Sequence, residues 1–509
     1  METLPIQLYT SQDVKQFDTL AQTQFHIEAY ALMCRAGQAT FNFLKKRWPK
    51  AHKIAVFCGA GNNGGDGFVV ARMAKEAGLN VCVYQVGEVI VDKLSAAAQQ
   101  AREAWLNTGE KILNVQDISW DMEVIVDALL GTGIRAPLAE PLQKTIEAIN
   151  QSGLPVLAVD LPSGIDGDTG KVVGSAIKAQ ATITFIGVKV GLLCGQAIDY
   201  VGQLYFDSLG VPEGIYAALM PKATRLSYDF LKPLIKPRPL SQHKGMSGHV
   251  VVVGGGEINY SGAVCLCAEG ALRSGAGLVS ACVASESLPL MARAPAEVMC
   301  YDFEDRIKIE NLLNRASVIV LGPGLGQHKK SQALFEKVLK SKKPLIVDAD
   351  ALNLLAQKPR RYEPWILTPH LGEASGLLGC ALEEVIEDPV KAAVLLQQKY
   401  GGVIVLKSAS TIIADEGETV SVLSGGLPNL ATGGTGDILA GIIGSLWGQG
   451  FSQQIAAQLG VCVHKEAALE ELALGDRGMM ASDLLLHIRG LLSKEPIDHD
   501  KSFEDFYFE

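Results

Sequence analysis

Short apolar runs alternate with amphipathic stretches along the first half of the chain. Such runs are typical of strands buried on both faces, and they lie at 53–57, 81–85, 124–126, 156–159 and 181–186. Apolar residues at helical spacing predict helices over 12–31, 36–46 and 68–77. This alternation predicts a Rossmann-like, doubly wound α/β fold around a parallel sheet.

The second half also alternates strands and helices, but with different sequences. Its apolar runs end in glycine or polar clusters at 249–254, 318–326, 345–354 and 365–373. We find no internal repeat, so we expect two different α/β folds rather than a duplication. Four prolines lie in 221–240, which lacks apolar periodicity and is typical of a linker. We predict domains over 1–221 and 225–500, with the linker at 222–240.

Length and composition limit the possible functions. A chain of 509 residues is too long for one ordinary core, and a net charge of −10 argues against nucleic acid or an anionic membrane as the main partner. The ten cysteines include no Cys-x-x-Cys pair, which argues against a zinc site or a disulfide framework. We recognise no secretory signal and no apolar run of membrane-spanning length, so we expect a cytoplasmic protein.

A glycine-rich loop follows the first of these strands. Gly59, Gly61 and Gly64 satisfy the Gly-x-Gly-x-x-Gly fingerprint between a strand and a helix. A redox dinucleotide site would also have an acid at the end of the second strand, but that strand ends in Gln85. Ordinary hydride transfer is therefore not expected. The polar residues 62–66 exceed what a tight turn needs, so we expect them to contact a ligand.

Polar residues lie at the carboxyl ends of several first-half strands. Asn63, Asp127 and Asp160 are far apart in sequence, but the carboxyl ends of parallel strands line one crevice. We therefore expect these side chains to converge on a ligand. The alternative for each acid is that it caps the turn after its strand.

The segment 429–441, Asn-Leu-Ala-Thr-Gly-Gly-Thr-Gly-Asp-Ile-Leu-Ala-Gly, predicts a glycine loop that leads into a helix. The first N–H groups of that helix would bind an anion such as phosphate. Asp437 is an unusual charge beside an anion unless it handles a proton, which makes it our first catalytic candidate. The alternative is that Asp437 only complements the helix dipole. No Lys-Ser or Lys-Thr follows the glycines, so this is not a Walker loop.

Strand ends of the second half predict a second crevice. Its expected lining is Gly324, Asp348, Asp350, Asn353, His370, Glu373 and Asp437. A lone histidine such as His370 is more often a hydrogen-bonded loop residue than a catalyst. The surrounding acids make His370 a candidate as well.

Three first-half segments resemble the signature segments of the NAD(P)H-hydrate epimerase family. They are Gly-Asn-Asn-Gly-Gly-Asp-Gly at 61–67, Asp-Ala-Leu-Leu-Gly-Thr-Gly at 127–133 and Asp-Leu-Pro-Ser-Gly-Ile-Asp at 160–166. The resemblance implies that Asn63, Asp127 and Ser163 bind a monovalent cation, usually potassium, and oxygen ligands suit such a hard cation. It also implies catalytic roles for Asp160 and Lys189, although a solvated loop lysine would fit the sequence too. The implied substrate-binding residues are Asn62, Asn63, Gly64, Gly65, Asp66, Gly131, Thr132, Gly133, Ile134, Arg135, Ala136, Pro137 and Asp160.

Six second-half segments resemble the NAD(P)H-hydrate dehydratase family of the ribokinase-like superfamily. In order they are His243-Lys-Gly, Gly262-Ala, Gly-Pro-Gly-Leu-Gly, Asp-Ala-Asp-Ala-Leu-Asn, Thr-Pro-His-x-Gly-Glu and Thr-Gly-Gly-Thr-Gly-Asp. The resemblance implies that the hydrate contacts Ala263, Gly324, His370 and Asp437. The implied adenine-nucleotide residues are Lys407, Ser408, Ala409, Ser410, Thr411, Gly433, Gly434, Thr435 and Gly436. One departure is Lys407-Ser408, where the family usually has Lys-Gly.

The two resemblances cover nearly the whole chain and together imply a bifunctional repair enzyme. The first half would interconvert the R and S epimers of hydrated NADH or NADPH. The second half would dehydrate the S epimer with ADP, or ATP, and magnesium, giving NAD(P)H, AMP and phosphate, with Asp437 as the base. We expect small-molecule substrates, no nucleic acid or membrane partner, and a homo-oligomer.

Two other functions fit parts of the same sequence. A ribokinase-like kinase for a vitamin or sugar alcohol would use Asp437 in the same way but release the phosphorylated product, with the first half as a nucleotide-binding scaffold. In the other alternative, the first half binds nucleotide without catalysis and the second half regulates it. Binding without turnover would distinguish this last alternative.

Overall fold

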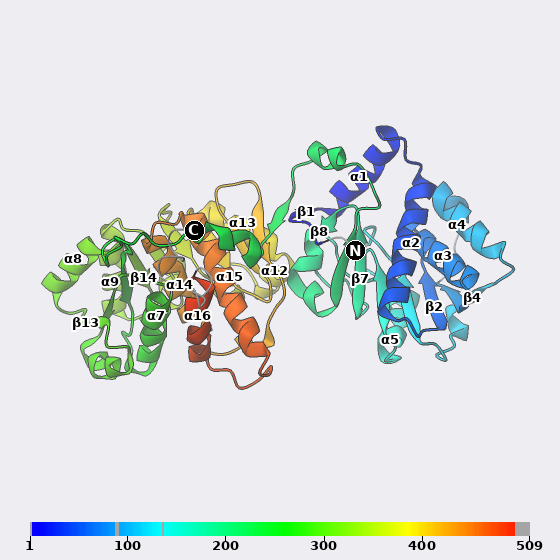
Figure 1. The fold of residues 1–509 in the computed structure, drawn as a ribbon. Coiled ribbons are helices and arrows are strands. Elements are labelled where there is room, and N and C mark those ends of the chain that lie inside the picture. The colour runs from blue at the N-terminus through cyan, green and yellow to red at the C-terminus, as the bar shows by residue number, and fades with distance from the viewer. Residues whose placement is uncertain (1–2, 87–90, 135–136, 494–509) are drawn as a thin grey trace, which may run out of the picture. The chain divides into compact units, whose positions relative to one another are not determined.

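The computed structural model describes residues 3–86, 91–134 and 137–493. Within these ranges the chain forms two compact α/β units (Figure 1). One unit contains Met1–Arg225 and the short segment Ile386–Asp388, and the other contains Leu226–Val385 and Pro389–Glu509. Each unit has a mainly parallel sheet, which confirms the predicted α/β class.

The first unit is built on a parallel sheet with the strand order β4-β3-β2-β5-β6-β7-β9. Its strands are β2 (Lys53–Cys58), β3 (Asn80–Gln85), β4 (Ile112–Asn114), β5 (Val124–Ala128), β6 (Val156–Val159), β7 (Ala181–Phe185) and β9 (Gln203–Asp207). The chain leaves β2 toward one edge and returns at β5 toward the other. This reversal between β2 and β5 is where doubly wound sheets form their ligand crevice.

Helices cover both faces of this sheet. Val56 of β2 packs in a cluster with Val69 of α3, whereas its neighbour Phe57 packs on the opposite face with Ile149 of α5. The helices are α1 (Ser11–Thr23), α2 (Ala29–Arg47), α3 (Asn62–Glu76), α4 (Ala96–Leu106) and α5 (Glu140–Gln151). A separate short strand, β1 (Gln7–Tyr9), pairs with β8 (Val188–Lys189) and β10 (Ala223–Arg225).

The second unit has the strand order β13-β12-β11-β14-β15-β16-β17-β18-β19, parallel as far as β17 and antiparallel beyond it. Its strands are β11 (His249–Val253), β12 (Leu278–Val283), β13 (Val298–Asp302), β14 (Val318–Leu321), β15 (Leu345–Val347), β16 (Trp365–Leu367), β17 (Val403–Leu406), β18 (Thr411–Ala414) and β19 (Val420–Leu423). The order reverses between β11 and β14, so a second crevice is expected at the carboxyl ends of these strands.

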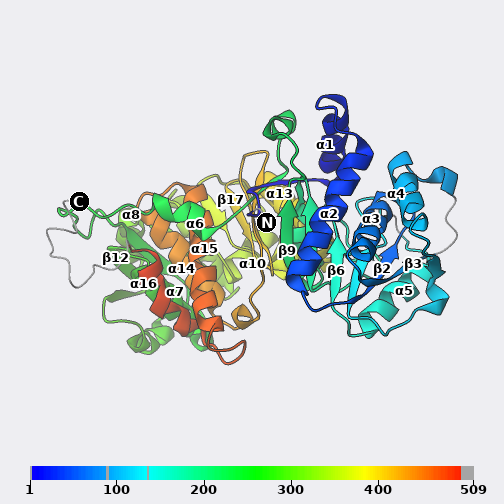
Figure 2. The same ribbon diagram turned by 45° about the vertical axis from the view of Figure 1, so that its right-hand side comes forward.

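One face of the second sheet is covered by α7, α14, α15 and α16, which lie together in Figure 2. Val250 and Val252 of β11 pack there against Ala268 and Ile443. The helices after Leu226 are α6 (Tyr228–Leu231), α7 (Ser261–Arg273), α8 (Arg306–Arg315), α9 (Lys329–Lys340), α10 (Asp350–Gln357), α11 (Leu371–Leu378), α12 (Leu382–Glu387), α13 (Pro389–Tyr400), α14 (Thr435–Gly448), α15 (Gln453–Leu472) and α16 (Leu485–Leu491).

Two expected boundaries in the first unit are wrong. The helix expected over 12–31 is two helices, because His26 between α1 and α2 has a φ of 54° that an α-helix cannot contain. The glycine segment is not a loop throughout, since α3 begins at Asn62 and includes Gly64. A Cβ at Gly64 would lie 2.0 Å from the Gly59 carbonyl oxygen, so glycine lets the helix start against the preceding loop.

The segment 222–240 contains regular structure. Residues of β10 pair with β1 in the first unit, and Leu226, Tyr228 and Leu231 are buried in the core of the second unit. The chain therefore passes from one core to the next around Arg225 and Leu226.

Two candidate active sites

Asp127 lies at the carboxyl end of β5 and is completely buried. Its carboxylate accepts hydrogen bonds from Ser163 Oγ at 2.6 Å, from Ser163 N at 2.8 Å and from Leu129 N at 3.2 Å. Burial raises the pKa of Asp127 to about 6, and the hydrogen bonds from Ser163 and Leu129 lower it in turn. The group is therefore mainly a carboxylate at neutral pH, held deep in the crevice.

Asn63 lies in the first turn of α3 and is hydrogen-bonded to the loop that follows β5. Its Nδ2 donates to the Leu130 carbonyl oxygen at 2.9 Å, while Leu130 N donates to Ser163 Oγ at 2.8 Å. Asn63 Oδ1 is buried and accepts no hydrogen bond from the residues that the structure describes. A buried amide oxygen without a donor, on a side chain bonded to the same Leu130 backbone as Ser163, is a ligand type that suits a monovalent cation.

Lys189 and Asp160 form a buried ion pair at the same edge of the first sheet. The Lys189 side chain is only 1% exposed and donates from Nζ to Asp160 Oδ1 and, at 3.0 Å, to Thr184 Oγ1. Thr184 Oγ1 in turn donates to Asp160 Oδ1 at 3.1 Å. Lys189 is therefore not a solvated loop lysine. Asp160 has a φ of 66°, a strained conformation of the kind that gathers at functional sites.

Of the predicted loop residues, Gly131 lies beside Asn63. A Cβ at Gly131 would lie 3.3 Å from Asn63 Cβ, and Asn62 Oδ1 accepts a hydrogen bond from Ser95 Oγ at 2.6 Å. Gly133 and Pro137 are exposed. Arg135 and Ala136 lie outside the described residues.

The second site forms at the start of α14. Its N-cap, Gly434, has a φ of 97°, and the first N–H groups of a helix have no partner within the helix. Asp437 lies in the first turn, and burial, with the nearby acids Asp348 and Glu373, raises its pKa to about 7 despite the opposing charge of Lys407. A carboxyl with a pKa near neutral pH is suited to taking up and releasing a proton.

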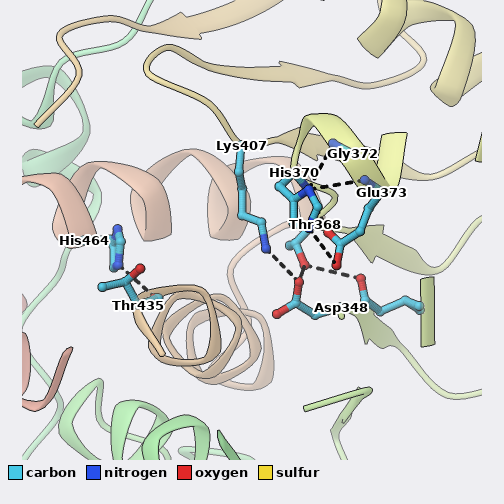
Figure 3. A network of polar contacts seen from close by, with 9 residues as sticks. Asp348, Thr368, His370, Gly372, Glu373, Lys407, Thr435 and His464 are labelled. Carbon is cyan, nitrogen blue, oxygen red and sulfur yellow. Dashed lines mark hydrogen bonds and ion pairs between the residues drawn. The ribbon is translucent and has the colours of Figure 1, made fainter. Parts of the chain in front are cut away.

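Lys407 places a positive charge beside the start of α14 (Figure 3). Its Nζ donates to Asp348 Oδ1 at 2.8 Å and lies 3.3 Å from where a Cβ on Gly436 would be. Thr368 Oγ1 also donates to Asp348 Oδ1 at 2.8 Å. Burial lowers the pKa of Lys407, but Asp348 and the other acids outweigh it, so the pKa is raised. The ammonium therefore stays charged where an anion would bind.

His370 caps α11, which begins directly after it (Figure 3). Nδ1 accepts from Gly372 N at 3.0 Å and from Glu373 N at 3.2 Å, and burial followed by the charge of Lys407 lowers the His370 pKa. The neutral ring therefore carries its hydrogen on Nε2, and the side chain is 60% exposed. Burial raises the pKa of Glu373 to about 7.

Three other predicted residues, Gly324, Asp350 and Ser408, follow strands β14, β15 and β17. Gly324 packs closely against the segment that leads to Ala263. A Cβ at Gly324 would lie 2.4 Å from the carbonyl oxygen of Tyr260, which comes shortly before Ala263 in the chain. Ser408, where the family usually has glycine, donates from Oγ to the Ser410 carbonyl oxygen at 2.5 Å and accepts from Ser410 N. The serine therefore closes a turn inside the predicted nucleotide loop. Asp350 accepts a hydrogen bond from Gly326 N at 2.8 Å, which makes it a loop anchor.

Comparison with known proteins assigns both halves. The family model described as YjeF-related protein N-terminus matches residues 29–191, and the model described as NAD(P)H-hydrate dehydratase matches residues 250–489. The chain is 44% identical over 488 residues to a bifunctional NAD(P)H-hydrate repair enzyme of Coxiella burnetii, a match that covers 96% of this chain and 99% of the relative. The Escherichia coli enzyme of the same description is 41% identical over 98% of this chain and 97% of its own. This chain belongs to the bifunctional NAD(P)H-hydrate repair enzymes.

Solved structures resemble part of the repair enzyme. A ribokinase-like superfamily protein of Enterococcus faecalis is 33% identical, with a TM-score of 0.49 over 53% of this chain and 94% of that one. An ADP/ATP-dependent NAD(P)H-hydrate dehydratase of Bacillus subtilis, co-crystallised with ATP and Mg²⁺, is 27% identical, with a TM-score of 0.47 over 52% of this chain and 96% of that one.

The repair enzyme combines an epimerase unit with a dehydratase unit, as the sequence predicts. In residues 3–86, 91–134 and 137–493, no helix is long and apolar enough to cross a membrane. The same residues contain no group of three or more His, Cys, Asp or Glu side chains that could hold a metal ion.

The crevice of the first unit contains the predicted Asp66 and a further acid, Asp18, that the sequence did not indicate. Burial, with the charges of Asp160 and Asp18, raises the pKa of Asp66 well above its ordinary range. Burial also raises the pKa of Asp18 to about 6, with Lys189 lowering it and Asp160 raising it. Asp18 is therefore an acid of this crevice that no motif indicates.

Helix α1 brings Asp18 to the crevice. Lys15, one turn earlier on the same helix face, donates from Nζ to the Thr132 carbonyl oxygen at 3.2 Å. The only sequence signal for this placement is the spacing of Lys15 and Asp18, which by itself is typical of any solvated helix face.

Proposed function

We propose that the crevice at the start of α14 dehydrates the S epimer of NAD(P)H hydrate at the expense of ADP, and that the crevice of the first sheet interconverts the R and S epimers. One observation carries the dehydratase half of the proposal. A carboxyl with a pKa near 7, Asp437, lies in the first turn of a helix whose free amides and neighbouring Lys407 suit an anion.

The chemistry follows from the leaving group. The hydrate carries a hydroxyl on carbon six of the nicotinamide ring, and hydroxide leaves poorly near neutral pH. Asp437 takes the proton of this hydroxyl while its oxygen attacks the terminal phosphoryl group of ADP, which releases AMP. The amides of 433–436 and the Lys407 ammonium stabilise the charge that develops on the phosphoryl oxygens. Phosphate then leaves, assisted by the electron pair of the ring nitrogen, and the resulting iminium ion loses a proton from carbon five of the ring to the departing phosphate or to water, which restores NADH or NADPH.

Magnesium fits this crevice as a companion of the nucleotide. Mg²⁺ usually keeps several waters and is held by one or two carboxylates together with phosphate oxygens, so it needs no cage of protein ligands. Glu373 and Asp348 are the acids beside Lys407 that would hold it. When bound, the ion supplies further positive charge to the phosphates.

Epimer exchange inverts the ring carbon that carries the hydroxyl, so it needs a group that can give and take a proton. We assign this role to Asp160 and Lys189, whose ion pair lies at the carboxyl edge of the first sheet. The dehydratase acts on one epimer, so an epimerase on the same chain lets both be repaired.

Potassium should bind Asn63, Asp127 and Ser163 and stabilise the epimerase unit. A tenfold excess of potassium over its dissociation constant would add about 1.4 kcal/mol, or about 3 °C in Tm. We expect Tm to be higher in potassium chloride than in choline chloride at equal ionic strength. Asp127→Ala should remove the difference. Equal melting in both salts, or an unchanged potassium effect in the variant, would refute the ligand assignment.

Recovery of reduced nicotinamide should require a nucleotide. Purified protein should restore the ultraviolet absorbance of NADH from a mixture of hydrate epimers when ADP and magnesium are present, with one AMP and one phosphate released for each NADH. Parallel reactions with ATP and without nucleotide test the co-substrate. Recovery without nucleotide would exclude phosphorylation, and a stable phosphorylated product would favour the small-molecule kinase.

A further inference from the structure

A buried histidine contacts the start of α14 from a helix that carries none of the predicted site residues. His464 of α15 is 9% exposed, and its Nε2 lies 3.0 Å from the Thr435 carbonyl oxygen (Figure 3). A carbonyl oxygen can only accept, so Nε2 carries the hydrogen. Burial lowers the pKa of His464 to about 4, and the ring is therefore neutral near pH 7.

The packing of α15 against α14 aims this side chain. A Cβ at Gly460 would lie 2.6 Å from Ile443 Cγ1 and 3.5 Å from its Cα, so glycine allows the two helices to approach closely. His464 is one turn further along the same face of α15. It therefore reaches the first residue of α14, where the anion is proposed to bind.

The bonded carbonyl and a proposed phosphate-binding amide belong to one peptide unit. The carbonyl of Thr435 and the N–H of Gly436 are joined by the same C–N bond and point in opposite directions. A donor at the carbonyl polarises the peptide and strengthens the N–H at its other end, because chains of hydrogen bonds reinforce one another. Lys407 Nζ lies close to Gly436 on the crevice side.

We propose that His464 is a positioning residue of the dehydratase, which holds the Thr435–Gly436 peptide and strengthens its amide toward the transferring phosphoryl group. This inference rests on the proposed ADP-dependent reaction. His464 itself touches neither nucleotide nor hydrate, and it acts through the peptide. The ring must be neutral, because a second cation near Lys407 would weaken the ion pair between Lys407 and Asp348.

His464→Leu and His464→Gln test the proposal. Leucine fills the volume without a donor, and we expect kcat for ADP-dependent dehydration to fall about tenfold, less than the loss of a whole oxyanion donor. The KM for the hydrate should stay within about twofold, since the lost effect concerns the transition state. Glutamine can place an N–H near the position of Nε2, so His464→Gln should recover at least half of the wild-type kcat.

Gln458→Leu on the same helix is the matched control. Gln458 is also buried, and its Nε2 donates to Ser421 Oγ at 2.9 Å, a hydrogen bond between α15 and β19. We expect this change to lower Tm with kcat within about twofold of wild type. If His464→Leu behaves like Gln458→Leu, His464 serves only packing and the proposal is wrong.

Two further outcomes are decisive. If His464→Leu does not fold, His464→Gln is compared with His464→Asn, whose shorter amide cannot reach Thr435. Equal kcat values in these two variants would overturn the proposal, and a slow asparagine variant beside a fast glutamine variant would support it. An absence of ADP-dependent dehydration in the wild type would instead overturn the proposed function.

Discussion

Asp437→Asn should lower the rate of hydrate dehydration by about two orders of magnitude or more and leave epimer exchange intact. Asparagine keeps the shape of the side chain but cannot accept the proton of the attacking hydroxyl. The free amides at the start of α14 remain, so nucleotide should still bind. The measurement is NADH recovery from purified S hydrate with ADP and magnesium, with epimer exchange followed separately by chromatography.

Asp305→Asn is the matched control for this variant. Asp305 is the N-cap of α8 and accepts from Lys308 N at 3.1 Å, so it is an acid at a helix start outside the proposed crevice. Asparagine caps equally well, and dehydration should be unchanged. Retention of more than a tenth of the activity in Asp437→Asn would remove Asp437 as the base.

The pH dependence of the wild type gives a further test of Asp437. Asp437 must be ionised to act as a base, so the wild-type kcat should fall as the pH is lowered below about 7.

Asp160→Asn should have the opposite effect and abolish catalysed epimer exchange. The S epimer should be consumed at the normal rate, while the R epimer persists except for its slow spontaneous conversion. Asparagine tolerates the left-handed backbone of Asp160, and its amide oxygen can still accept from Lys189. The variant keeps this hydrogen bond but removes the counter-charge of Lys189, so part of the roughly 3–5 kcal/mol cost of breaking a buried ion pair remains.

Chromatography that resolves the two epimers should show a fast phase followed by a long plateau in Asp160→Asn. Asp207→Asn is the control, because Asp207 also ends a strand of the first sheet and accepts from Leu209 N at 2.8 Å, as a turn-capping acid would. It should leave both epimers reactive. Uniform slowing of both epimers in Asp160→Asn would mean that the two crevices share one site or that the variant damages the fold.

The architecture of both units could be predicted because their strands are buried on both faces. Segments such as 250–253 and 403–406 are apolar throughout, and this pattern can be recognised without knowledge of the tertiary structure. The break between α1 and α2 could not be predicted, since it depends on a left-handed turn at His26 rather than on apolar spacing. The early start of α3 depends on contacts that only the folded chain makes, such as Gly64 against Gly59.

The residues of the two sites divide in a similar way. Asp160 and Asp437 could be chosen as candidates because they follow a strand or begin a helix inside a recognisable motif. Asp18 and His464 could not, because each lies within a helix and is a candidate only through a neighbour distant in sequence. The ion pair between Lys407 and Asp348 could not be predicted from the sequence either, although both residues belonged to predicted segments.

The central claim is that one chain carries two separate crevices with complementary reactions, and mixing the two variants tests it most directly. Asp437→Asn alone should exchange epimers without restoring NADH, and Asp160→Asn alone should restore NADH only from the S epimer. An equal mixture of the two, given both epimers with ADP and magnesium, should convert all of the hydrate to NADH, with chromatography showing that the R epimer disappears. A mixture that leaves the R epimer at the plateau of Asp160→Asn alone would contradict the account.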